Sequence, residues 1–170
     1  MTAPHAFSIR VAGPADAEAI TALLSASYSI LLNARYDRPT LDPALPFMTR
    51  ANPALLRSGT YYVAAGEAGD LAGCGGWTMG RPGTGEIVAG EAHIRHFATH
   101  PARLKRGVGA ALMAHCIAEA RQSGVRTLHC FSTLNAVDFY RASGFVVVGP
   151  IEVTMAPGLR LPSMLLRRAL

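Results

Sequence analysis

A short stretch rich in glycine and basic residues has the composition of an anion-binding loop. It reads Arg103-Leu104-Lys105-Arg106-Gly107-Val108-Gly109-Ala110 and lies between a predicted strand and a predicted helix. Glycines let the backbone approach a ligand closely, and the first N–H groups of a helix have no partner within it. The loop lacks the Lys-Ser/Thr ending of a Walker A motif and the third glycine of a dinucleotide fingerprint. Two interpretations stay open here: a cradle for an anionic ligand, or an ordinary turn at a helix start.

Histidines just before this loop have spacings that resemble those of a metal site. His93 precedes His96 by three residues, and His96 precedes His100 by four. Three-residue spacing in a strand sends the side chains to opposite faces, and the second pair spans a predicted turn at Pro101. We therefore predict no metal site. The same alternation places Glu91 and His93 on one face of the strand and turns His96 to the other.

Hydrophobic periodicity and turn residues predict the elements that must position these side chains. Helical spacing favours helices over 107–123 and 135–142 and a further helix around 20–24, whereas prolines break 33–53 into a partly helical insertion. Residues 81–90 are rich in glycine and predict a loop. Strands are expected over 8–12, 61–65, 71–77, 92–99, 127–131, 145–148 and 163–168. The chain is thus predicted to be an α/β (α+β) protein, a mixed sheet flanked by helices, forming one domain over residues 1–170.

Two motifs in the second half of the chain are similar to those of a known family. Residues 96–112, HFATHPARLKRGVGAAL, resemble the acetyl-CoA-binding segment of GNAT acetyltransferases, and residues 135–145, NAVDFYRASGF, resemble the motif that follows it there. The family consensus Gln/Arg-x-x-Gly-x-Gly/Ala is matched by Gly107 and Gly109, whereas Leu104 stands at its first position. The resemblance is sharp over 91–148 and looser at 61–77.

The resemblance implies a mostly antiparallel GNAT-like sheet that is splayed between the strand ending at Thr99 and the strand at 127–131. Acetyl-CoA would lie in the gap, where backbone groups of Phe97, Ala98 and Thr99 would pair with the pantetheine arm. Its pyrophosphate would rest on N–H groups at the start of the following helix, aided by the helix dipole. Those groups belong to Lys105, Arg106, Gly107, Val108, Gly109 and Ala110. Asn135 would either cap its helix or touch the cofactor.

The implied reaction is direct transfer of an acetyl group from acetyl-CoA to the primary amine of a small molecule or peptide. Tyr140 matches the family's tyrosine near the sulfur and is our candidate general acid, although a packing role is the alternative. His93 aligns by spacing with a family glutamate and, with Glu91, is the candidate base; a packed histidine and an ordered water are the alternatives. A free N–H at the splayed strand, that of Ala98, is the candidate oxyanion donor.

Composition limits the other functions that the chain could have. The formal charge of +5 comes from 15 arginines and one lysine against 11 acids. These cations are scattered except for the cluster of Arg103, Lys105 and Arg106. No basic stripe is interleaved with aromatics, so we do not expect a nucleic-acid partner. Three distant cysteines predict neither a disulfide framework nor a zinc site. Without a long uncharged apolar run or a secretory leader, we expect a soluble, cytoplasmic protein with no membrane partner.

The sequence leaves the catalytic competence and the acceptor of the protein open. A GNAT-like protein that binds CoA without catalysis, as a sensor or interaction protein, is the alternative function, because Leu104 departs from the consensus. The acceptor amine is not identified, although segments 28–53 and 81–90 are the places where selectivity would arise. An exposed C-terminal strand would permit a homodimer.

Overall fold

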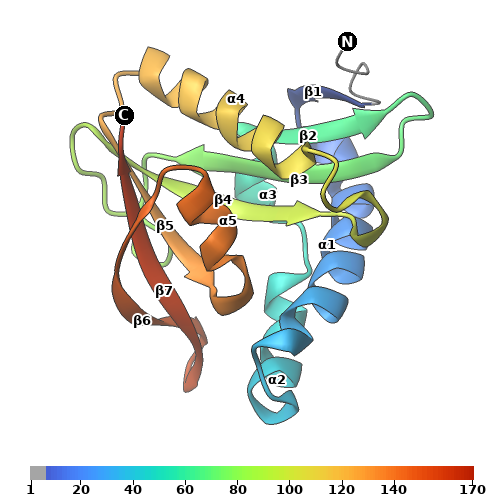
Figure 1. Cartoon of the computed structure of the whole chain (residues 1–170), viewed down its shortest axis with the longest axis vertical. Helices are drawn as coiled ribbons and strands as arrows, with labels where there is room; N and C mark the ends of the chain where they lie inside the picture. The colour runs from blue at the N-terminus through green and yellow to red at the C-terminus, as the bar shows by residue number, and fades with distance from the viewer. Residues whose placement is uncertain (1–6) are drawn as a thin grey trace.

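The computed structural model describes residues 7–170 (Figure 1). Residues 1–6, which belong to the segment predicted to lack a secretory leader, lie outside the described part of the chain. The strands are β1 (Phe7–Val11), β2 (Tyr61–Gly66), β3 (Leu71–Thr78), β4 (Glu91–Thr99), β5 (Thr127–Thr133), β6 (Val146–Ala156) and β7 (Leu159–Ala169). The α-helices are α1 (Ala17–Leu31), α2 (Arg38–Met48), α3 (Pro53–Leu56), α4 (Val108–Gln122) and α5 (Val137–Ala142). Single 3₁₀ turns are η1 (Pro14–Asp16), η2 (Leu32–Ala34), η3 (Pro101–Arg103) and η4 (Leu134–Ala136).

One sheet of seven strands forms the centre of the molecule, in the order β1-β2-β3-β4-β5-β7-β6. Every neighbouring pair is antiparallel except β4 and β5, which run parallel. A parallel pair needs a crossover, and α4 supplies it between these two strands. The predicted fold class, a mixed and mostly antiparallel sheet flanked by helices, is therefore confirmed.

The parallel pair β4–β5 is joined only at its beginning. Glu91 to His93 pair with Thr127 to His129, and the six residues of β4 from Ile94 to Thr99 have no register with β5. Figure 1 shows the two strands diverging, with α5 beside the far end of β5. This is the splayed central pair that the family resemblance implies. It leaves backbone groups of β4 without a strand partner on that side.

Two apolar layers cover the sheet on opposite faces. The α4 face includes Leu112 and Met113 of that helix, whereas the α1 face includes Ile20 and Leu24. Strand β3 permits close packing because a Cβ on its Gly73 would stand 2.7 Å from the side chain of Val108. The small residue therefore brings the start of α4 onto the sheet, where the glycine loop lies.

Helix α2 is more regular than the predicted insertion over 33–53. The Asp37 carboxylate accepts a hydrogen bond from the Thr40 N–H and caps the helix, while Pro39 lies in its first turn. Pro43 and Pro46 lie inside the helix, and each removes a donor from the helical ladder. The segment is still helical because its apolar face, Leu41, Ala44 and Met48, is buried against the rest of the protein.

The C-terminal hairpin is longer than the strands predicted at 145–148 and 163–168. Strands β6 and β7 meet at a turn in which Gly158 has a φ of +74°. Gly149 and Pro150 lie on the edge strand β6, where a bulge between Val147 and Gly149 accommodates the irregularity. Pro162 lies on β7 just beyond its last pair with β5, Thr133 with Ser163, so no bond to β5 is lost there. The exposed valines at 146–148 lie on this edge. The homodimer stays a prediction.

Helix α1 and its flanking turns, residues 14–34, are long and apolar enough to cross a membrane by length and composition alone. In this fold the helix contacts β3 and β4, and its Ile20, Leu23 and Leu24 are buried. These buried residues account for part of the apolar composition, since 28% of the apolar window is buried.

Candidate active site

A cavity of about 280 Å³ lies beside the divergence of β4 and β5. Its walls come from α1, α2, β4, β5, α5 and the C-terminal hairpin, which is why no short sequence motif describes it. The lining side chains are mostly apolar or aromatic, with two arginines, a histidine and a few neutral polar groups. We call this the central cavity. Its size is just below the usual range of small-molecule pockets, roughly 300–1,000 Å³.

Tyr140 lines the central cavity from α5 and is only 6% exposed. Its ring packs edge-on against Phe139 and Phe145, and Cys130 of β5 lines the same cavity. Burial raises the pKa of this tyrosine well above its usual value of 10. The phenol is therefore protonated near neutral pH and available to donate at the splay. The packing role is therefore observed, and the role of general acid stays a prediction.

A second tyrosine, Tyr28 of α1, lines the central cavity and begins the segment 28–53 that is predicted to set selectivity. Its hydroxyl donates to the carbonyl oxygen of Phe97 at 2.8 Å, and its ring lies 5.9 Å from that of His96. Burial also raises the Tyr28 pKa. The sequence offered one indication of this position: Tyr28 follows Ile20 and Leu24 at intervals of four residues, so its hydroxyl lies at the end of the buried face of α1.

The backbone of β4 differs from the prediction at Ala98. The N–H of His100 bonds to the oxygen of Ala72 on β3, and Ala98 lies opposite Cys74 two residues along the same register. Because bonding alternates along an antiparallel strand, the Ala98 N–H also points toward β3. This corrects the assignment of Ala98 as a free oxyanion donor and pantetheine partner. The groups that face the gap belong to Phe97 and Thr99.

His96 also departs from its predicted orientation. A β-bulge lies between Arg95 and Ala98, and His96 adopts a φ of +51°. The bulge reverses the alternation, so the His96 ring meets Tyr28 and its Nε2–H donates to the carbonyl of Met48 at 2.6 Å. It therefore lies on the same face as His93, and burial lowers its pKa.

The glycine loop has the backbone of an anion cradle. Lys105 and Gly107 both have left-handed conformations, with φ of +58° and +80°, and α4 begins directly afterwards at Val108. Left-handed residues next to a helix start turn successive N–H groups toward one concave side. Around Gly107 nothing approaches the position of a Cβ within 4 Å, so the space is open. Leu104, which replaces the consensus polar residue, is exposed.

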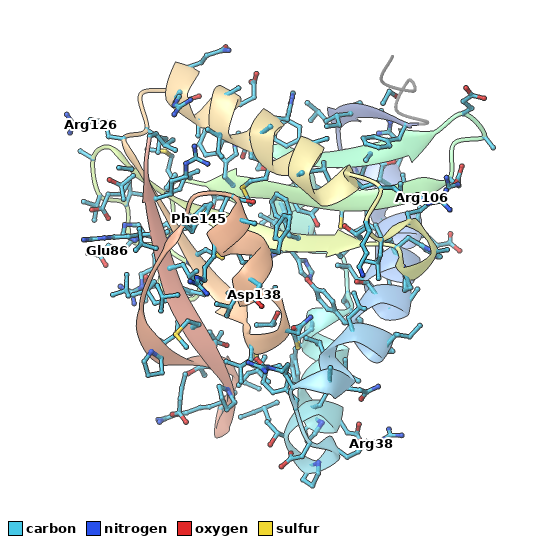
Figure 2. The ribbon with its side chains drawn as sticks, in the orientation of Figure 1. Arg38, Glu86, Arg106, Arg126, Asp138 and Phe145 are labelled. Carbon is cyan, nitrogen blue, oxygen red and sulfur yellow. The ribbon has the colours of Figure 1, made fainter. Side chains whose placement is uncertain are left out.

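Basic side chains beside the cradle are unequal in their availability. Arg103 is held by the Asp70 carboxylate at 2.8 Å, across the turn between β2 and β3. Lys105 and Arg106 are exposed and belong to none of the ion pairs within residues 7–170. Figure 2 shows Arg106 at the outer side of the loop before α4. The side chains of Lys105 and Arg106 are thus available to bind the diphosphate of a cofactor.

The remaining cradle residues connect it to the splay. A Cβ on Gly109 would stand 3.0 Å from the ring of Phe139 and 3.5 Å from Thr99 Oγ1, so a small residue is required where α4, α5 and β4 meet. Val108, the first residue of α4, is buried against β3, whereas Ala110 is exposed.

Asn135 does not cap a helix, which corrects one of its two predicted roles. Neither the turn η4 nor helix α5 has a side-chain cap bond, and their N-cap residues are Thr133 and Ala136. The Asn135 Oδ1 atom is buried and has no hydrogen-bond partner. A buried acceptor without a donor destabilises the free protein, and a bound ligand that donates a hydrogen bond to it would remove this cost. It fits the second predicted role, contact with a bound cofactor.

The candidate base residues line a different cavity of about 150 Å³, which we call the side cavity. There the Glu91 carboxylate lies 3.0 Å from Nε2 of His129, and the His129 ring stacks on His93 with centroids 5.3 Å apart. The structure thus brings Glu91 and His93 together, through a histidine that sequence reasoning missed. Tyr140 lies in the central cavity, and Phe131 lines both.

His93 has the electrostatics of a weak base. Burial, reinforced by the neighbouring His129, lowers its pKa from 6.5 to about 4, and its Nδ1 atom is buried without a partner. An imidazole of this pKa accepts a proton poorly from an ammonium group near neutral pH. Within residues 7–170 no group of three or more potential ligands is arranged to hold a metal ion.

Comparison with known proteins decides the family. Residues 18–145, which include the splay, the cradle and α5, match the Acetyltransferase (GNAT) family. The chain belongs to this family. Like other GNAT proteins it is built for acetyl transfer, with acetyl-CoA as the cosubstrate that the family uses.

Solved structures with the same fold share little sequence with this GNAT protein. A GCN5-related N-acetyltransferase from Rhodopseudomonas palustris is 20% identical with a TM-score of 0.77, covering 100% of this chain and 99% of the other. PaiA N-acetyltransferase from Thermoplasma acidophilum, in complex with coenzyme A, is 14% identical with a TM-score of 0.71, covering 96% and 99%. Ard1 from Thermoplasma volcanium is 20% identical with a TM-score of 0.66, covering 97% and 98%. Sequence identities of 14–20% show that these proteins share the fold, and no more than the fold.

Proposed function

We propose that this protein is an N-acetyltransferase that acetylates a primary amine in the central cavity. The observation that carries the proposal is the position of Tyr140 at the splay, between the glycine cradle and a cavity open to a small acceptor. Acetyl-CoA supplies the acetyl group as an activated thioester. PaiA from Thermoplasma acidophilum, which has the same fold, holds coenzyme A. Cradle, gap and the unpartnered Asn135 acceptor are all features of this chain that suit the cofactor.

The chain's own groups have distinct parts in the transfer. The N–H groups at the start of α4, with Lys105 and Arg106, bind the diphosphate. Gap-facing backbone groups of Phe97 and Thr99 orient the arm that follows. During transfer a C–N bond forms and the C–S bond breaks; the amine nitrogen gives up a proton, and Tyr140 donates one to the departing sulfur. The Tyr140 proton is replaced from solvent.

Removal of the amine proton is assigned to water. Water is favoured over His93 because the His93 pKa of about 4 makes it a poor acceptor, and because His93 and Glu91 line the side cavity. An acceptor bound as its ammonium ion would lose one proton before transfer, to solvent at the mouth of the central cavity. Water then takes the second proton, which the nitrogen releases as the C–N bond forms. His93 and His129 then serve to pack the base of the splay.

The proposal is tested by incubating the purified protein with acetyl-CoA and a panel of amines, with thiol release and mass spectrometry of the acceptor as readouts. We expect stoichiometric thiol and acetylated amine from at least one acceptor class. Acetyl-CoA binding without transfer to any class would instead support the alternative, a CoA-binding protein without catalysis.

A further inference from the structure

Charge in the central cavity is of one sign. Among residues 7–170 its lining includes Arg50 and Arg95 and no aspartate or glutamate. The acids Glu86 and Glu91 line the side cavity instead. A cavity built for a polyamine or another purely cationic acceptor would be expected to contain a carboxylate, because a buried cation requires a counter-charge.

Arg95 is the more informative of the two arginines. It lies on β4 next to the bulge, is half-buried, and donates one hydrogen bond of 3.0 Å to Thr78 Oγ1. None of the ion pairs within residues 7–170 includes it. A guanidinium has five N–H donors in a planar fork, so most of its donors are left for a ligand. The fork matches a carboxylate, which it binds through two parallel hydrogen bonds.

The rest of the cavity wall indicates the chemical character of the remainder of the acceptor molecule. Phe47, Met48, Leu55, Met155 and Leu161 form an apolar surface. Arg50 is exposed on the same rim. A volume of about 280 Å³ suits a small molecule, since part of the cavity at Tyr140 must be shared with the acyl donor.

We propose that Arg95 binds the carboxylate of the acceptor, which is a small amino acid-like amine with an apolar side chain. This inference rests on the proposed function and names its substrate class. The carboxylate at Arg95 and the side chain against the apolar wall leave the amino group to face the splay and Tyr140. Arg95 is thus a specificity-determining residue.

Paired acceptors test this assignment by transfer. Leucine is compared with isoamylamine, and phenylalanine with phenethylamine, so that the members of each pair differ by the carboxylate alone. We expect kcat/KM to favour the amino acids by about tenfold or more, the effect of one charge-assisted pair. Arg95→Met should remove the preference and leave acetyl-CoA affinity unchanged. Arg57→Met, which removes an equal charge from an exposed residue outside the cavity, is the matched control.

A binding experiment separates this inference from the proposed function, because it needs no turnover. N-acetyl-leucine and N-acetyl-isoamylamine are titrated into the CoA-bound protein. Binding of N-acetyl-leucine at least about tenfold tighter, lost in Arg95→Met and kept in Arg57→Met, supports the site even if no acceptor is acetylated. Equal or tighter binding of the neutral amide, or a preference for the decarboxylated amines in transfer, overturns it while leaving acetyl transfer intact.

Discussion

The Tyr28 hydroxyl donates a hydrogen bond of 2.8 Å to the backbone carbonyl of Phe97, and so ties helix α1 to β4 where that strand diverges from β5. This carbonyl faces the gap and has no strand partner there. A carbonyl oxygen can accept two hydrogen bonds, so the tyrosine satisfies it in the free protein without excluding a ligand. Of the two tyrosines in the central cavity, Tyr28 therefore holds the backbone of β4 in place, whereas Tyr140 is the proposed general acid.

Tyr28→Phe should lower the stability of the protein more than it lowers catalysis. The substitution keeps the ring and leaves the Phe97 carbonyl without its buried donor, which costs about 1–3 kcal/mol in free energy of unfolding. Urea unfolding of the parent and the variant measures it. Unchanged stability would show that the bond contributes nothing to holding β4 in place.

Tyr140→Phe should have the opposite profile. Loss of a general acid lowers kcat by roughly 10²-fold or more, whereas acetyl-CoA affinity should change little because the ring stays in its aromatic packing. Steady-state kinetics with the best acceptor from the amine panel, beside titration of the cofactor, give both quantities. A variant with the parent's kcat would return Tyr140 to a purely packing role.

Acid should destabilise the protein partly through His93. Its folded-state pKa of about 4 lies below its ordinary value of 6.5, so below pH 6.5 the unfolded chain binds a proton that the folded chain does not. The free energy of unfolding should therefore decrease as pH falls from 6.5 toward 4, by at most about 3 kcal/mol from this residue. His93→Phe should flatten that decrease. In NMR, a His93 imidazole that titrates near pH 6.5 would contradict the account.

Asn135→Leu should separate stability from cofactor binding. Replacing an unpartnered buried amide oxygen with an apolar group of similar shape is expected to leave the free protein equally stable or more stable. The same change removes an acceptor for the cofactor and should weaken acetyl-CoA binding by about tenfold. Thermal unfolding with and without acetyl-CoA measures both effects. A destabilised apo protein with full affinity would show that Asn135 has a purely structural partner.

The sequence was informative where local chemistry determines local structure. Gly107 and Gly109 mark the cradle because a left-handed conformation and a close helix contact both exclude larger residues. Tyr140 follows from the motif around it. These features need only neighbouring residues. The periodicity of α4 predicts the helix, and the left-handed Gly107 directly precedes its first residue, Val108.

Features that depend on distant segments were missed or misassigned. The bulge at His96 reverses the strand alternation, so the predicted orientation of His96 and the free N–H of Ala98 were wrong. Tyr28 and Arg95 reach the central cavity only through the packing of α1 and the register of β4. Pro43 and Pro46 made the segment of α2 look irregular in sequence, although it forms a helix because one of its faces is buried.

Isothermal titration of acetyl-CoA into the parent protein, Gly107→Glu and Gly124→Glu tests the central claim most directly. Gly107 and Gly124 flank the same helix with φ of +80° and +83°, and at neither residue would a Cβ meet another atom within 4 Å, so both variants carry similar backbone strain. Only the first places a carboxylate in the cradle. We predict micromolar binding by the parent and Gly124→Glu, and at least about a tenfold loss in Gly107→Glu. No binding by the parent, or equal affinity in both variants, would contradict a cofactor site at the start of α4.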